Sequence, residues 1–152
     1  MDVLALLQAE SQCRDLVIAA AEAVDGQQYE TFADCFTEEA VLQRPGGEPL
    51  NGRVAILASY ANKSRDRLTQ HVLCNHRVVV DPSGFAESSC KVLLYVSDRR
   101  REHVPEGRMA DSKHHVGEFR DRLILTTDGW RIQSRKAWFE LQVDARSESP
   151  PA

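Results

Sequence analysis

The sequence has no long apolar run, no excess of positive charge and no leader-like start, and each absence excludes a class of protein. No stretch approaches the ~20 apolar residues that cross a membrane. The formal net charge is −4, whereas nucleic-acid-binding surfaces are usually basic. The opening residues, MDVLALLQAE, lack the basic segment of a secretory signal peptide. We therefore expect a protein that engages neither a membrane nor nucleic acid.

Closely spaced metal or disulfide ligands are also absent. The four cysteines are scattered along the chain and form no C-x-x-C pair: Cys13, Cys35, Cys74 and Cys90. Without a secretion signal, such cysteines are expected to be free thiols in a reducing compartment, which indicates the cytoplasm. No compact ligand motif is present, so we expect neither a metal nor a cofactor.

What remains is typical of one globular domain, with 152 residues, 42% of them hydrophobic and 28% charged. In the first half, apolar residues recur at helical spacing. This pattern predicts helices over Ser11–Asp25, Gln28–Phe36 and Gly52–Asn62, with a short strand at Ala40–Leu42. We predict a single domain over residues 1–145 and a disordered tail over 146–152.

After Asp66 the apolar period changes to two, which is typical of strands. Four strands are predicted, over Thr69–Val80, Gly84–Val96, His114–Thr126 and Trp130–Val143. Helices followed by an antiparallel meander indicate the α+β class, with the helices covering one face of the sheet. The long polar connection, Ser97–Lys113, is expected to shape the entrance to the concave space beneath them.

Several short motifs occur in a recognisable order. They are Val24-Asp25, Tyr29 to Phe36, Glu38 to Val41, Leu50 to Ile56, His71 to Asn75, and Asp128 to Ile132 with Arg135. In this order the chain, from about Ser11 to Leu141, resembles the SnoaL-like branch of the nuclear transport factor 2-like superfamily.

The resemblance implies a cone-shaped fold, in which three N-terminal helices pack in a strongly curved, mostly antiparallel sheet around a pocket. The superfamily includes scytalone dehydratase, a dehydrochlorinase, polyketide cyclases, steroid isomerases, small subunits of ring-hydroxylating dioxygenases and binding-only proteins. A small hydrophobic, aromatic, polyketide-like or steroid-like ligand is therefore implied. Because the outer face of the sheet often joins subunits in this family, we also expect a homodimer or higher homo-oligomer.

His71 and Asp25 occupy the places of the family's general base and the aspartate that orients it. Asp25 is also unusual on physical grounds, because a carboxylate in the last turn of a helix faces the negative end of the helix dipole. An acid in an unfavourable place suggests a partner. The pair is either a proton-abstracting dyad or a buried brace between helix and sheet, and the sequence leaves both open.

Strand alternation places His71, Leu73 and Asn75 on one face, predicted to be the pocket face, and His76 with Val78 on the other. The remaining candidate ligand-binding residues are Tyr60, Arg135 and His115, although alternation leaves open whether His115 or the adjacent His114 faces the pocket. Arg135 matches an arginine of the dehydrochlorinase. It is predicted either to bind an anionic group or to form an ion pair with Glu118 or Asp121 across the sheet.

Two departures separate this chain from the lyases it resembles. The tyrosine that precedes the aspartate in scytalone dehydratase is Val24 here, and the dehydrochlorinase lysine is Ala20. Two functions therefore stay open. One is a cofactor-independent dehydratase-like lyase or isomerase acting through His71 and Asp25. The other is a non-catalytic binding or accessory protein, similar to a dioxygenase small subunit.

Overall fold

The computed structural model describes residues 1–146, and these residues form an α+β fold as predicted. The helices are α1 (Val3–Asp25), α2 (Tyr29–Asp34) and α3 (Arg53–Ala61). The strands are β1 (Phe36–Gln43), β2 (Leu50–Asn51), β3 (Arg67–Asp81), β4 (Phe85–Asp98), β5 (His103–Val104), β6 (Gly107–Arg108), β7 (Lys113–Thr126) and β8 (Gly129–Asp144). Of the predicted tail, only Arg146 lies within the described residues.

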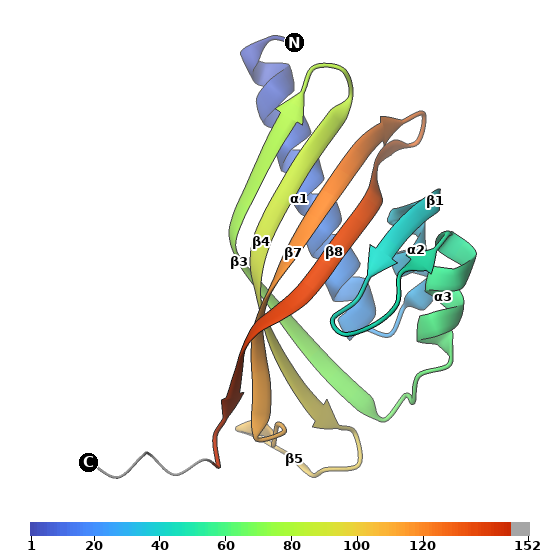
Figure 1. Ribbon diagram of the computed structural model, residues 1–152. Helices are drawn as coiled ribbons and strands as arrows, with labels where there is room; N and C mark the ends of the chain where they lie inside the picture. The colour runs from blue at the N-terminus through green and yellow to red at the C-terminus, as the bar shows by residue number, and fades with distance from the viewer. Residues whose placement is uncertain (147–152) are drawn as a thin grey trace.

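The main sheet has six strands in the order β2-β1-β8-β7-β4-β3. Its neighbours run antiparallel except for β1, which lies parallel to β8. The four long strands twist strongly around one another, while α1 crosses behind them and α2 and α3 lie beside β1 (Figure 1). Within residues 1–146, all three helices therefore lie on one side of the sheet, and none lies on the other side of its long strands.

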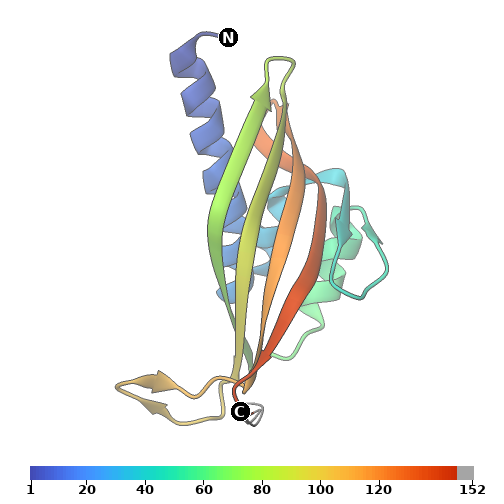
Figure 2. The same cartoon turned by 60° about the vertical axis from the view of Figure 1, so that its left-hand side comes forward.

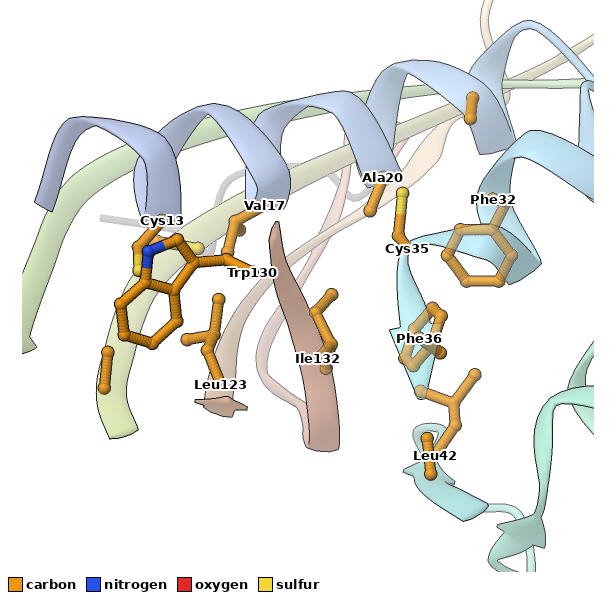
Figure 3. Close-up of a cluster of buried hydrophobic side chains, with 14 of the residues drawn as sticks. Cys13, Val17, Ala20, Phe32, Cys35, Phe36, Leu42, Leu123, Trp130 and Ile132 are labelled. Carbon is orange, nitrogen blue, oxygen red and sulfur yellow. The ribbon is translucent and has the colours of Figure 1, made fainter. Parts of the chain in front are cut away.

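The core lies between α1 and the sheet. Figure 3 shows side chains of α1 facing apolar residues of β7 and β8, with aromatic residues of the α2–β1 region alongside. The fully buried members include Cys13, Val17, Phe32, Phe36, Leu42, Leu123 and Ile132. Burying one such aliphatic or aromatic side chain contributes about 1.5–3 kcal/mol, so this cluster holds the helix layer on the sheet.

Helix α1 begins eight residues earlier than predicted, at Val3 rather than Ser11. The Asp2 side chain caps it by accepting a hydrogen bond from the Ala5 backbone N–H at 2.8 Å. Leu4 and Leu7 are mostly exposed in this extension. Only Leu6 and Ala9 of this extension reach the core, so its apolar stripe is too sparse to mark a helix in the sequence.

A β-bulge in β3 contradicts the predicted alternation. The pairing with β4 shifts between Cys74 and Arg77, and Asn75 adopts a φ of 52° inside this interval. The extra residue reverses the phase of the strand. Val78 is consequently buried in the core, and His76 turns to the same side as His71.

A similar register shift in the β7–β8 pairing, between Arg122 and Leu123, places the two tryptophans of β8 on different faces of the sheet. Trp130 is buried in the core beneath α1. Trp138 instead lies against Arg120 and Lys136, whose cations contact its ring. A bulge between two residues changes which face each one occupies, and spacing alone does not reveal it.

The predicted long connection is partly structured. Strands β5 and β6 form a separate two-stranded hairpin that projects away from the body of the molecule (Figure 2). Among the described residues, no helix is long and apolar enough to cross a membrane.

Candidate functional site

A cavity of about 360 Å³ opens between the helices and the concave face of the sheet. All three helices contribute to its wall, together with β1, β3, β4, β7 and β8 and the loops that follow β1 and α3. Its deeper lining is apolar and includes Phe32, Leu42, Val92, Leu94 and Phe119. Cavities of this size and character are where small ligands bind.

Small residues keep this space open. Ala20 and Ala21 of α1 line the cavity, where larger side chains would fill it. Gly117 of β7 lies opposite them on the sheet side. A Cβ atom at Gly117 would lie 2.4 Å from the Trp138 carbonyl oxygen, so only glycine permits this close approach of β7 and β8.

Asp25 and His71 are in direct contact. The His71 ring Nδ1 lies 2.6 Å from Asp25 Oδ1, and the two side chains are 16% and 13% exposed. Asp25 also accepts a hydrogen bond from the Thr69 hydroxyl at 2.8 Å and one from the His71 backbone N–H at 2.7 Å. Strand β3 is the edge of the sheet, so this carboxylate also satisfies a backbone donor that no neighbouring strand pairs.

These contacts fix the chemistry available to His71. With an ionised Asp25 as acceptor, the proton of the neutral imidazole resides on Nδ1, and Nε2 carries the free lone pair. His71 lines the cavity, and no hydrogen bond to Nε2 comes from the described residues. This arrangement leaves Nε2 without a hydrogen-bond partner among the described residues.

Arg135 also lines the cavity, but its charge is already matched. Its Nε and one terminal nitrogen each donate to the Asp121 carboxylate at 2.7 Å, and both residues are buried. Although burial opposes the charge, Asp121 holds the pKa of Arg135 above its ordinary value. Of the two predicted ion pairs, the structure forms the one with Asp121, because Glu118 instead pairs with Lys91 and Arg120.

Tyr60 lies in the cavity wall, as expected of a ligand-contacting residue. Its phenol is buried, and burial raises its pKa. His115 is not part of the lining. Its ring stacks on that of Phe139, a lining residue, with 4.2 Å between the ring centres. His114 stacks on Tyr95 instead.

Asn75 does not line this cavity, contrary to the prediction. It lies at the bulge of β3 beside a second, shallow hollow that His76 and Cys90 also line. The prediction failed because it assumed unbroken alternation from His71. The connection after β4 was also expected to shape the entrance, yet no residue from Arg99 to Lys113 lines the cavity.

Sequence reasoning missed Thr69 and three basic residues of the cavity, namely Arg44, Lys63 and Arg67. Thr69 shares a strand face with His71, so alternation was available as a signal. The basic residues come from separate loops and a strand end, and only the fold brings them together. Within residues 1–146, no group of three or more His, Cys, Asp or Glu side chains is placed to hold a metal ion.

Comparison with known proteins assigns a family. The family model of the SnoaL-like domain matches residues 5–136, which is most of the chain. A comparison with curated proteins gives no match.

Solved structures share the fold at low sequence identity. A nuclear transport factor 2-like protein from Novosphingobium aromaticivorans is 21% identical, with a TM-score of 0.74 over 90% of this chain and 84% of its own. A candidate scytalone dehydratase from the same organism is 15% identical, with a TM-score of 0.71 and coverage of 91% and 89%. A candidate dehydratase of the same superfamily from Streptomyces avermitilis is 20% identical, with a TM-score of 0.72 and coverage of 86% and 96%.

Proposed function

Because this chain belongs to the SnoaL-like domain family, we propose that it is a small-molecule lyase or isomerase in which His71 is the base and Asp25 orients it. The observation that carries the proposal is the hydrogen-bonded pair at the cavity wall, with Nδ1 and Oδ1 2.6 Å apart. The similarity to candidate dehydratases supports the class of reaction and leaves the substrate open.

The first step of the reaction is proton abstraction. His71 Nε2 takes a proton from a carbon next to an electron-withdrawing group, and Asp25 stabilises the imidazolium that forms. Tyr60 supplies the second function. Since burial raises the pKa of its phenol, Tyr60 stays protonated and donates a hydrogen bond to the developing oxyanion or leaving group. No cofactor takes part in this scheme.

Hydrogen exchange tests the base directly and needs no knowledge of the product. A panel of aromatic and alicyclic ketones, including 2-tetralone, is incubated with the protein in D₂O, and loss of the α-proton signal is followed by NMR. We expect the protein to accelerate exchange for at least one member. His71→Ala should remove at least about 100-fold of that acceleration, which is typical for a general base. Undiminished exchange in His71→Ala would refute the assignment.

A non-catalytic binding or accessory protein is the second candidate. It is favoured by the other two hydrogen bonds of Asp25, to Thr69 and to the His71 backbone, because both tie α1 to the sheet without any chemistry. In that case the panel would show binding to the cavity with no exchange above the buffer rate. The same experiment thus distinguishes the two functions by whether the protein accelerates hydrogen exchange.

We further propose that the protein is a cytoplasmic homodimer. The four cysteines are free, which suits a reducing compartment.

The dimer interface is proposed on the side of the sheet away from the helices. There, one row of paired residues crosses four strands and is wholly apolar: Val72, Leu93, Val116 and Leu141. Val72 and Leu141 are 48% and 59% exposed. Light scattering should give twice the monomer mass, and Leu141→Arg should give the monomer.

A further inference from the structure

We propose that the ligand of this cavity is an anion, an aromatic or alicyclic molecule whose carboxylate or phosphate is held at the mouth by Arg44, Lys63 and Arg67. This inference rests on the proposed ligand-binding function and names the class of molecule that the same cavity takes. It adds a binding role for three residues that lie outside the His71–Asp25 pair.

The three cations come from three parts of the chain. Arg44 follows β1, Lys63 follows α3, and Arg67 begins β3, yet all of them line the one cavity. Two of them meet at Tyr60. The Lys63 Nζ lies 4.1 Å and the Arg44 Cζ 5.3 Å from the centre of its ring.

None of these three residues has an acidic partner among the described residues. Other arginines do have such partners, because Arg135 pairs with Asp121, and Arg100 pairs with both Asp66 and Asp98. Three positive charges at one opening repel one another unless an anion joins them. Partial desolvation of the Lys63 amine at the cavity wall, together with the neighbouring charges of Arg44 and Arg67, lowers its pKa from 10.5 to about 8.

The remaining charges of the cavity do not cancel these cations. Glu118 is paired with Lys91 and Arg120, and the single charge of Asp25, which is not part of the cavity lining, is outnumbered by the three cations. The field at the mouth is therefore positive, and a cleft with apolar walls concentrates such a field on a ligand. These cations also differ from basic residues on an open surface. They adjoin an apolar cavity wall, which can hold the uncharged part of the ligand.

The arrangement also orients the ligand. With its acid group at Arg44, Lys63 and Arg67, the apolar body extends toward the deeper lining near Val92 and Phe119. His71 lies in the same wall of β3, four residues beyond Arg67. The mouth thus recognises the charge, and the chemistry takes place on the carbon skeleton.

Binding of matched naphthalene compounds tests the inference. We expect 2-naphthoate or 2-naphthyl phosphate to bind at least about 10-fold more tightly than the uncharged isostere 2-naphthamide at pH 7, measured by calorimetry or fluorescence. A tenfold difference corresponds to about 1.4 kcal/mol, and one ion pair at a partly dry site supplies that much. Raising the pH through about 8, where Lys63 loses its charge, should weaken binding of the anions alone.

Lys63→Met should lower the affinity for the anion about 5- to 10-fold and leave that for 2-naphthamide unchanged. Lys136→Met is the matched control, because Lys136 is exposed beside Trp138 and is not part of the cavity lining, and it should change neither affinity. Lys63 lies outside the hydrophobic core, so we expect the variant to fold, and Arg67→Met provides an independent repeat. Equal affinities for all three compounds, unaffected by Lys63→Met, would overturn the inference and leave the cavity as a neutral binding site. Failure of every compound to bind would overturn the proposed function as well.

Discussion

Asp25 and His71 are partners, but the structure predicts unequal consequences when each is removed. Asp25 accepts three hydrogen bonds, two from the His71 side chain and backbone and one from Thr69. A hydrogen bond to a charged group that is mostly buried contributes about 1–1.5 kcal/mol after discounting for its partial exposure. Asp25→Ala therefore loses about 3–4.5 kcal/mol of contacts.

Removing the Asp25 carboxylate also removes an unfavourable interaction, which offsets part of this loss. Asp25 is the last residue of α1, and a carboxylate there costs about 0.3–1 kcal/mol against the helix dipole. The net destabilisation expected for Asp25→Ala is thus about 2–4 kcal/mol. His71→Ala removes one of the three hydrogen bonds and leaves the tie from Asp25 to the strand, so its cost should be about 1–2 kcal/mol.

Urea unfolding followed by circular dichroism measures both values. Asp15→Ala serves as the control, because Asp15 is exposed on the same helix and makes no hydrogen bond or ion pair with the described residues; its effect should stay within about 0.5 kcal/mol. Equal losses for Asp25→Ala and His71→Ala would refute the reasoning, since the two extra hydrogen bonds would then contribute nothing. Thr69→Val, which removes only the hydrogen bond from the Thr69 hydroxyl to Asp25, should lower the free energy of unfolding by about 1 kcal/mol.

Three further predictions follow from contacts elsewhere in the fold. Gly117→Ala should cost about 1–3 kcal/mol in urea unfolding, because its Cβ would lie 2.4 Å from the Trp138 carbonyl oxygen. Asp121→Asn should cost about 3–5 kcal/mol, since it leaves the buried charge of Arg135 without its partner; an unchanged midpoint would contradict this. Burial lowers the pKa of His76 below 6.5, so its contribution to stability is complete above pH 6.5 and is lost as the pH falls through the lowered value. His76→Gln should flatten the decline in melting temperature on acidification, and an unchanged slope would exclude this role.

Periodicity was sufficient for the class of the fold and for the order of its elements. The change from a helical to an alternating pattern after Asp66 placed the helices before the sheet, and the structure confirms this. The family resemblance is confirmed as well, by a match over residues 5–136. The element order could be predicted because burial of one face imposes a regular spacing on the sequence, whereas the resemblance rested on the order of short motifs.

The site was only partly accessible in this way. The resemblance drew attention to His71 and Asp25, and in the structure the two side chains are in contact and His71 lies in the cavity wall. Asn75 was misplaced because a bulge adds one residue to β3 without leaving a mark in the apolar pattern. The one local signal for this bulge is that Asn75 is an asparagine, a residue type that tolerates the positive φ found there, and this signal is weak.

Taken by itself, the sequence determined that a three-helix layer covers a curved sheet and that an acid at the end of α1 needs a partner. Tertiary structure alone decided that Arg135 is neutralised by Asp121 and that Arg44, Lys63 and Arg67 line one cavity. The reason is physical. Periodicity records which face of an element is buried, whereas the charge around a cavity depends on distances between loops and strand ends far apart in the chain.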